Sequence, residues 1–221
     1  MTENVLTAES IYKSFALDDH EIKVLENISL QVKQGEFVAI MGKSGSGKST
    51  LLSILAGLDQ PTTGKVVLNG DDLTHMSEED LALKRQSDIG FVFQSFHLIP
   101  TLTVQENITF PLSIARKQNP ERVKELVDAV ELGHRVNSFP HQLSGGEKQR
   151  TAIARALVAQ PKILFADEPT GNLDEKNADQ VMQLLLSLQK AFNTALVIVT
   201  HDSSLAQLAD RTITIVDGQL V

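Results

Sequence analysis

The first part of the chain alternates short apolar segments with polar ones. Every second residue from 28 to 32 is apolar, which predicts a strand with one buried face. Residues 37–41 are apolar throughout, as is typical of a parallel strand covered on both faces. This strand runs into glycines 42, 45 and 47, and residues 48–58 then place three leucines on one helical face. Along the chain, a predicted antiparallel sheet comes first and is followed by a strand, a glycine-rich loop and a helix.

Strand and helix patterns alternate further along the chain. Strands are predicted at 65–68, 89–93, 163–166, 195–200 and 212–216, and helices at 77–86 and 175–191. The dipeptides Asn69-Gly70 and Asp217-Gly218 are typical of hairpin turns. This alternation is typical of a parallel sheet covered by helices, so the predicted fold class is α/β.

Residues 95–159 have a mainly helical pattern. Pro100, Pro111, Pro120 and Pro140 are expected to mark the breaks between its pieces. We therefore expect one domain over residues 1–221, in which 1–94 and 160–221 form the core with the antiparallel β subdomain. The segment 95–159 is expected to be an inserted helical subdomain.

Composition narrows the classes of protein to consider. A chain of 221 residues with 42% hydrophobic composition can bury a sizeable core. Its formal charge of −8 argues against broad capture of nucleic acid, so no nucleic-acid partner is expected. The absence of cysteine excludes disulfides and thiolate metal sites. The first ten residues do not resemble a secretory signal, and no apolar stretch reaches the ~18 residues of a membrane span, so we expect any membrane role to be peripheral.

The residues from Gly42 to Ser49 fit the phosphate-binding pattern G-x-x-x-x-G-K-S/T. In this pattern backbone N–H groups surround phosphate, Lys48 reaches the β and γ phosphates, and the Ser49 hydroxyl binds Mg²⁺. The positive end of the following helix dipole adds to the attraction. The flanking strand and helix favour this interpretation over a flexible glycine turn.

Two acidic residues follow the predicted strand 163–166. Asp167 stands where a second metal ligand is needed, and Glu168 could accept a proton from an attacking water. The alternative is that both merely end the strand with polar groups. Combined with the phosphate loop, the pair favours a nucleotide-hydrolysing site.

The segment Leu143-Ser144-Gly145-Gly146-Glu147 allows two interpretations. Ser144 and Glu147 form the pattern of a helix capping box. Capping does not explain the two glycines, each of which costs up to ~1 kcal/mol of helix propensity relative to alanine. The glycines therefore suggest close approach by a ligand, and the helix start suggests a second anion site.

Taken together, these segments resemble the ATP-binding cassette family, the ATPase subunits of ABC transporters, over essentially the whole chain. The residues that carry the resemblance are GKSGSGKST up to Thr50, Gln94 in FVFQ, LSGGE, ILFADEP, GNLD and THD, in the family's order. FVFQSFHLIPTLTVQENI and ADEPTGNLD resemble the branch that serves lipoprotein release, macrolide efflux and cell division. The resemblance implies a P-loop NTPase fold with a RecA-like parallel core sheet, an antiparallel β subdomain and a helical subdomain.

The family resemblance also implies the site. It implies catalytic roles for Glu168, His201, Gln94 and Lys48, and Mg²⁺ binding by Ser49, Gln94 and Asp167. Contacts to ATP are implied for Phe15, Gly42, Lys43, Ser44, Gly45, Ser46, Gly47, Lys48, Ser49, Thr50, Ser144, Gly145, Gly146, Glu147 and Asp174. Tyr12 competes with Phe15 for stacking on adenine, although the spacing to the next strand favours Phe15.

The implied partners follow from the same resemblance. ATP would be held in a head-to-tail homodimer between one subunit's phosphate loop and the other's LSGGE. A separate integral membrane permease would hold the protein peripherally at the cytoplasmic face of the cell membrane. Its contact surface could be an apolar groove formed by Phe96, Leu98, Ile99 and Leu102, or these residues could form a buried core.

Two other functions fit parts of the sequence. An ATPase of a soluble repair or translation machine would keep the same motifs, but such members typically carry coiled-coil insertions or two cassettes. A GTPase or kinase would leave LSGGE and the acid pair unexplained, and the chain lacks an N-K-x-D segment for guanine.

Overall fold

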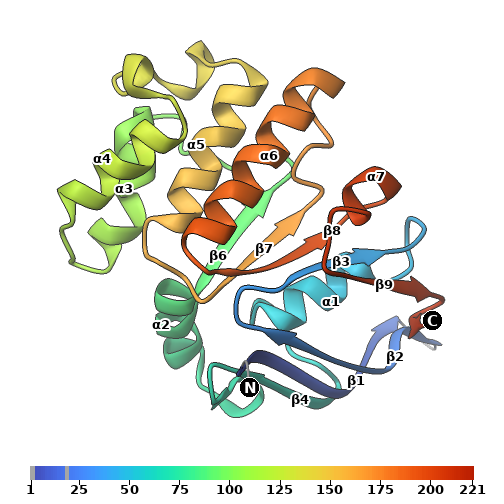
Figure 1. Cartoon of the computed structure of the whole chain (residues 1–221). Coiled ribbons are helices and arrows are strands. Elements are labelled where there is room, and N and C mark those ends of the chain that lie inside the picture. Colours follow the sequence, from blue (N-terminus) through green and yellow to red (C-terminus); the bar gives the residue numbers. More distant parts are fainter. Residues whose placement is uncertain (1–2, 18–19) are drawn as a thin grey trace. The chain divides into compact units, whose positions relative to one another are not determined.

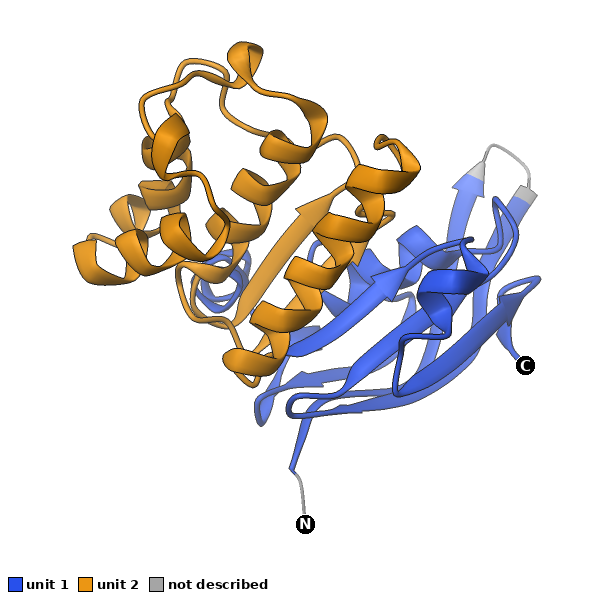
Figure 2. Ribbon diagram, turned by 45° about the horizontal axis from the view of Figure 1, so that its top comes forward, with its two compact units in different colours: residues 1–85, 195–221 blue, residues 86–194 orange. Residues whose placement is uncertain are grey.

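The computed structural model describes residues 3–17 and 20–221. The chain forms two compact units, one of residues Met1–Arg85 with Ala195–Val221 and one of Gln86–Thr194 (Figure 2). The predicted helical segment 95–159 lies wholly within the second unit, and the finer division into subdomains stays a prediction.

The first unit contains an antiparallel sheet in the order β2-β1-β4-β5. Its strands are β1 (Asn4–Leu17), β2 (His20–Lys33), β4 (Thr63–Leu68) and β5 (Asp71–Asp72). The alternation at 28–32 is confirmed, because Ile28, Leu30 and Val32 are buried. Strand β1 was not predicted: its pairing with β2 shifts register between Ala8 and Ile11, so no period of two survives there.

The first unit also contains parallel strands around the glycine-rich loop. Strand β3 (Phe37–Met41) pairs in parallel with β8 (Ala195–Val199) and with β9 (Arg211–Val216), and β10 (Gln219–Leu220) pairs antiparallel with β9. All residues of β8 are buried, as the uninterrupted apolar pattern predicts. The loop leads from β3 into α1 (Lys48–Leu55) (Figure 1).

Three short helices complete the connections of this part of the chain. They are η1 (Leu73–His75), α2 (Glu78–Asp88) and α7 (Ser203–Ala206). The predicted cap of α2 is present, since the Ser77 hydroxyl accepts a hydrogen bond from the Asp80 N–H at 3.2 Å.

The second unit places helices beside two parallel strands, β6 (Ile89–Phe93) and β7 (Ile163–Asp167) (Figure 1). Its helices are α3 (Val104–Ile114), α4 (Pro120–Ala129), η2 (Gly133–Arg135), η3 (Pro140–Gln142), α5 (Gly145–Leu157) and α6 (Glu175–Ala191). Pro120 and Pro140 begin a helix each, because a missing N–H costs nothing at the first helical position.

The prediction that Pro111 breaks the helical pattern is wrong, because Pro111 lies inside α3. Proline leaves the Asn107 carbonyl without its usual helical donor. The helix continues nevertheless, since Ile108 and Leu112 are buried on either side and the Ala115 N–H donates to the Pro111 carbonyl at 3.1 Å. Burial of the apolar face outweighs the local defect.

Gly90 in β6 permits a test of how closely the second unit is packed. A Cβ at this position would lie 2.6 Å from the Ala156 carbonyl oxygen and 2.7 Å from Leu164 Cδ1. We expect Gly90→Ala to lower the free energy of unfolding by about 1–3 kcal/mol, measured by urea denaturation. Gly133→Ala is the control, because nothing lies within 4 Å of its Cβ. Equal stability of the two variants would contradict the packing argument.

Candidate functional site

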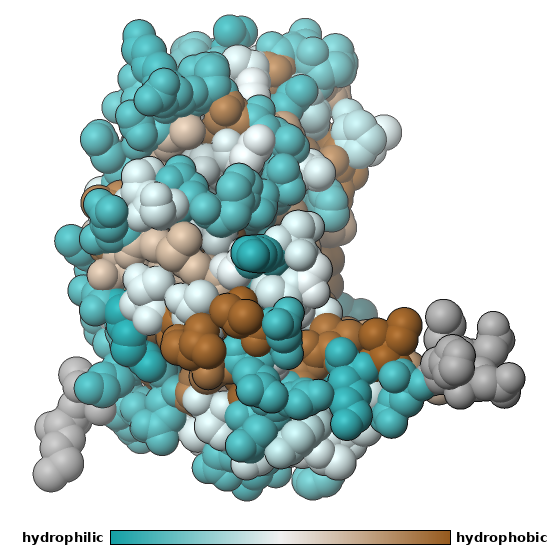
Figure 3. Space-filling model, turned by 90° about the vertical axis from the view of Figure 1, so that its right-hand side faces the viewer, coloured by the Kyte–Doolittle hydropathy of each residue, from teal (hydrophilic) through white to brown (hydrophobic). Residues whose placement is uncertain are grey.

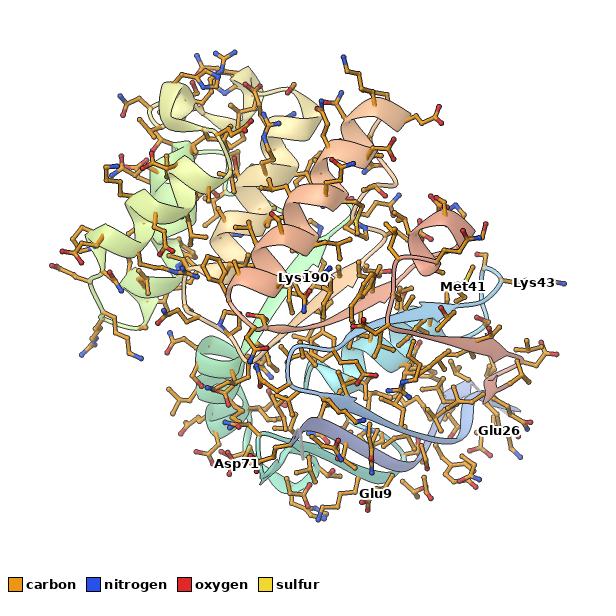
Figure 4. The ribbon with its side chains drawn as sticks, viewed as in Figure 1. Glu9, Glu26, Met41, Lys43, Asp71 and Lys190 are labelled. Atoms are coloured by element: carbon orange, nitrogen blue, oxygen red, sulfur yellow. The ribbon has the colours of Figure 1, made fainter. Side chains whose placement is uncertain are left out.

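Lys48 turns its side chain back into the glycine-rich loop. Its ammonium donates hydrogen bonds to the carbonyl oxygens of Gly42 at 2.9 Å and Lys43 at 2.8 Å, and the residue is only 8% exposed. Lys43 in contrast extends away from the loop (Figure 4). The loop therefore holds one cation at its centre, as binding of a polyanion requires.

Two glycines of this loop leave no room for a side chain. A Cβ on Gly42 would lie 2.5 Å from the Ile215 carbonyl oxygen, and one on Gly47 would lie 2.8 Å from both Leu25 Cδ2 and the Val24 carbonyl oxygen. Gly47 also has a left-handed φ of 98°. The loop is thus wedged against β2 and β9, which fixes its curvature.

The start of α1 differs from the other helix starts. It has no side-chain cap and no acidic residue in its first turn. Among the described residues, side chains cap the other α-helices, namely Ser77, Thr103, Asn119, Ser144, Asp174 and Asp202. The first N–H groups of α1 and the positive end of its dipole are therefore left to an external anion.

Ser46 supplies a second sign that the loop suits a ligand. Its hydroxyl oxygen is buried and has no hydrogen-bond partner in the part of the chain that the structure describes. Buried polar atoms are nearly always paired, so such an atom inside an anion-binding loop fits a phosphate oxygen. The loop residues thus fit the triphosphate that the sequence predicts.

His201 lies at the same sheet edge as the loop. Ile40 of β3 pairs with Val199 of β8, and the Thr200 N–H donates to the Ile40 carbonyl at 3.1 Å. His201 is the next residue and is exposed. The first unit therefore brings Lys48, Ser49 and His201 to one edge, as expected for the ends of neighbouring parallel strands.

The second unit brings Gln94 and Glu168 together. Phe93 of β6 pairs with Asp167 of β7, so the next residues of both strands leave the sheet at the same edge. A Cβ on Gly171 would lie 2.8 Å from Gln94 Nε2 and 3.4 Å from Glu168 Oε2. Both side chains therefore reach the same short stretch of backbone.

Glu168, the residue predicted to accept a proton from water, has an unusual backbone conformation. Its φ is 43°, a left-handed value that non-glycine residues rarely adopt, and the Gly171 N–H donates to its carbonyl at 3.0 Å. Such conformations concentrate at functional sites, where the surrounding structure holds them. This backbone strain supports the prediction that Glu168 is a functional residue.

Asn172 is a contributor that the sequence argument missed. Its amide donates to the Gln94 carbonyl at 3.0 Å and accepts from Gln94 Nε2 at 3.4 Å. Asn172 thus holds both the backbone and the side chain of Gln94. Its position in GNLD was the available signal, but that motif does not say which residue the asparagine contacts.

Oxygen ligands for a metal are present among the predicted residues. The Ser49 hydroxyl, the Gln94 amide oxygen and the Asp167 carboxylate are hard donors of the kind that Mg²⁺ prefers. No group of three or more His, Cys, Asp or Glu side chains able to hold a metal occurs within residues 3–17 and 20–221. Ser49 lies in the first unit, whereas Gln94 and Asp167 lie in the second, so their joint binding of Mg²⁺ stays a prediction.

The capping box predicted at Ser144 is confirmed. The Ser144 hydroxyl accepts from the Glu147 N–H at 3.3 Å, and the Glu147 carboxylate accepts from the Ser144 N–H at 2.8 Å and from Arg135 Nε at 2.9 Å. Burial alone would raise the pKa of Glu147, but the hydrogen bonds from Ser144 and the Arg135 charge outweigh it, so this pKa is lowered. Glu147 therefore stays charged and holds the helix start.

The glycines after Ser144 have a neighbour within the chain. A Cβ on Gly145 would lie 3.1 Å from Leu173 Cδ2, and one on Gly146 would lie 3.0 Å from Asn177 Oδ1. The segment 171–177 thus accounts for the missing side chains. A second anion site at Ser144 remains a prediction.

Asp174 is engaged at the start of α6. Its carboxylate accepts from the Asn177 N–H at 3.0 Å and from Asn177 Nδ2 at 2.6 Å. These hydrogen bonds, the side-chain one first, lower the pKa of Asp174. Its observed task is to cap a helix, and its contact with ATP stays a prediction.

The turn after Gln94 is strained and clamped by Arg155 of α5. Phe96 and His97 both have left-handed φ angles, of 59° and 47°. Arg155 donates to their carbonyl oxygens at 2.9 Å and 2.5 Å. Phe96, Leu98, Ile99 and Leu102 are all half-buried, which does not decide between an apolar groove and a buried core, so a contact surface for the permease stays a prediction.

Both aromatic residues considered for stacking on adenine are exposed, Tyr12 at 41% and Phe15 at 45%.

The face of the molecule in Figure 3 is mostly hydrophilic, with hydrophobic residues gathered in the lower half of the view. No helix in the described part of the chain is long and apolar enough to cross a membrane.

Comparison with known proteins identifies relatives along the full length. A family described as ABC transporter matches residues 25–171. The lipoprotein-releasing system ATP-binding protein LolD of Acinetobacter baylyi is 47% identical, covering 99% of this chain and 97% of that protein. The uncharacterized ABC transporter ATP-binding protein YbbA of Escherichia coli K12 is also 47% identical, with the same coverage.

Solved structures give the same result. The ATP-binding cassette MJ0796, in a dimeric post-hydrolysis state bound to ADP and Pi, superposes with a TM-score of 0.88 at 40% identity. The match covers 97% of this chain and 96% of that one, and a second dimeric structure of MJ0796 matches equally well. These structures confirm the predicted fold class, and the LolD and YbbA relatives confirm the predicted family resemblance.

Proposed function

Because this chain belongs to the ABC transporter family, we propose that it binds and hydrolyses ATP with Mg²⁺ as the motor subunit of a transporter. Two copies close around two ATP molecules, and hydrolysis reopens them. That motion drives a separate membrane permease for export or for extraction of lipids or lipoproteins. The observation that best supports the proposal is the Lys48 ammonium, held inside a glycine-rich loop whose helix has no cap.

The first unit supplies the phosphate-binding groups. The Lys48 ammonium exchanges its two carbonyl partners for β- and γ-phosphate oxygens, and the N–H groups of the loop and of α1 bind the remaining oxygens. The Ser49 hydroxyl would hold Mg²⁺, which would neutralise developing phosphate charge. His201 contacts the γ phosphate from its position beside the loop.

The second unit supplies the groups for hydrolysis. Glu168 accepts a proton from the attacking water as the bond to the γ phosphorus forms, and ADP leaves as the terminal P–O bond breaks. Asp167 and Gln94 would hold Mg²⁺ together with Ser49, and Gln94 also positions the water. The two hydrogen bonds between Asn172 and Gln94 hold Gln94 in place for this task.

We infer a homodimer because the chain has a single copy of each motif, so that two copies of the chain are needed to complete two sites. Each subunit's LSGGE, with Ser144, Gly145, Gly146 and Glu147, completes the site of the other subunit. The dimeric structures of MJ0796 at 40% identity support this arrangement. The permease holds the protein at the cytoplasmic face of the membrane, and the names of the LolD and YbbA relatives support a transporter role.

Turnover by the purified protein tests the proposal. We expect ATP hydrolysis that requires Mg²⁺, stops with EDTA, and rises more than linearly with protein concentration because two subunits form each site. GTP should be a poorer substrate, and a permease encoded beside this chain should stimulate turnover in detergent. Tight RNA or DNA binding at physiological salt, with no response to a permease, would instead indicate a soluble ATPase machine.

A further inference from the structure

Lys13 of β1 is largely buried and hydrogen-bonded, and it lies next to an exposed aromatic residue. Its ammonium donates to Asp59 Oδ1 at 2.8 Å and to the Gln60 carbonyl at 2.7 Å. The same nitrogen lies 4.9 Å from the centroid of the Phe15 ring. The Lys13 side chain is 11% exposed, whereas Phe15 is 45% exposed. One face of the ring therefore rests on a fixed cation, and the residue still presents surface to solvent.

The cluster formed by Lys13, Phe15, Asp59 and Gln60 is connected to the phosphate loop through neighbouring residues of the first unit. Lys13 pairs in register with Leu25, and Leu25 is the side chain that a Cβ on Gly47 would meet at 2.8 Å. Phe15 is two residues further along the strand, about 7 Å away. Asp59 and Gln60 come shortly after α1, whose other end carries Lys48. The same helix thus serves the phosphate loop at one end and the anchor of Lys13 at the other.

We propose that Lys13 is a positioning residue for the purine base: it braces one face of Phe15 so that the opposite face stacks on adenine. The inference rests on the proposed function. An exposed phenylalanine that samples several rotamers must be ordered when a base binds, and a brace that exists beforehand removes this entropic cost. Tyr12 is almost equally exposed, but no ring or cation contact accompanies it in the described part of the chain.

The test compares a ligand that has a purine base with one that has only the phosphates. Binding of ATP and of inorganic tripolyphosphate, which lacks a base, is measured by calorimetry for Lys13→Met. We expect ATP to bind roughly two- to fivefold more weakly, the range of an exposed cation–π contact. Tripolyphosphate affinity and kcat at saturating ATP should not change. Lys13→Arg, which keeps the cation, should restore ATP affinity, and Lys23→Met removes an exposed charge from the same hairpin as a control.

A double-mutant cycle isolates the Phe15 contact. Lys13→Met should add nothing to the loss of ATP affinity in Phe15→Ala, because the brace has no ring to hold. Additive losses, an equal loss of tripolyphosphate affinity, or a loss confined to Tyr12→Ala would each overturn the inference. If the unmodified protein binds neither probe, the proposed function itself fails, which is a distinguishable result.

Discussion

Lys48→Ala should lose ATP binding almost completely. Lys48 places the one ammonium that the loop encloses, and both of its carbonyl partners belong to the loop itself. Removing one partner of a buried charged pair costs about 2–5 kcal/mol. We therefore expect ATP affinity to fall by at least roughly 30-fold and turnover to disappear at ordinary ATP concentrations. Calorimetric titration with ATP is the direct measurement.

Lys65→Ala is a suitable control for this prediction. Lys65 is half exposed and pairs with Asp72 at 3.4 Å, so the same charge is lost from the same unit away from the loop. Both variants need a thermal unfolding curve, because Lys48 also ties the loop together. A well-folded Lys48→Ala variant with normal ATP affinity would remove the loop from the proposed mechanism.

Glu168→Gln should separate ATP binding from hydrolysis. The amide cannot accept the water proton, so turnover should fall by about 10²–10⁴-fold, the usual contribution of a general base. Binding should persist, since the phosphate-binding groups are unchanged. ATP then stays between two subunits, and the variant should accumulate as a dimer on gel filtration with ATP and Mg²⁺.

Glu121→Gln serves as the matched control, because Glu121 is exposed at the start of α4. It should turn over ATP normally and show no trapped dimer. Hydrolysis at the normal rate by Glu168→Gln would assign the base to another residue. An ATP-loaded variant that stays monomeric at every concentration would rule out the shared site.

Short sequence patterns were sufficient to predict much of the fold and of the candidate site. Apolar runs located β3, β7 and β8 because strands buried on both faces need no partner to be recognised. The glycine-rich loop and the Ser144 capping box were found because each is defined by a few neighbouring residues. The Asn69-Gly70 turn was predicted for the same reason, and Asn69 has the left-handed φ of 50° that it requires.

The features that sequence reasoning missed depend on segments far apart in the chain. Bulges hid β1, since a shifted register breaks the period of two. Burial on both sides kept Pro111 inside a helix. The small size of Gly146 reflects contact with Asn177, and the clamp on Gln94 comes from Asn172, more than seventy residues away. No local pattern contains such contacts.

The Arg155 clamp has a mechanical consequence. Arg155 and Ser144 belong to the same helix, α5 and its cap, eleven residues or about 16 Å apart. Because Arg155 holds the turn at Phe96 and His97 and α5 is a continuous helix, we expect a displacement of this turn to move Ser144 at the other end of the helix as well.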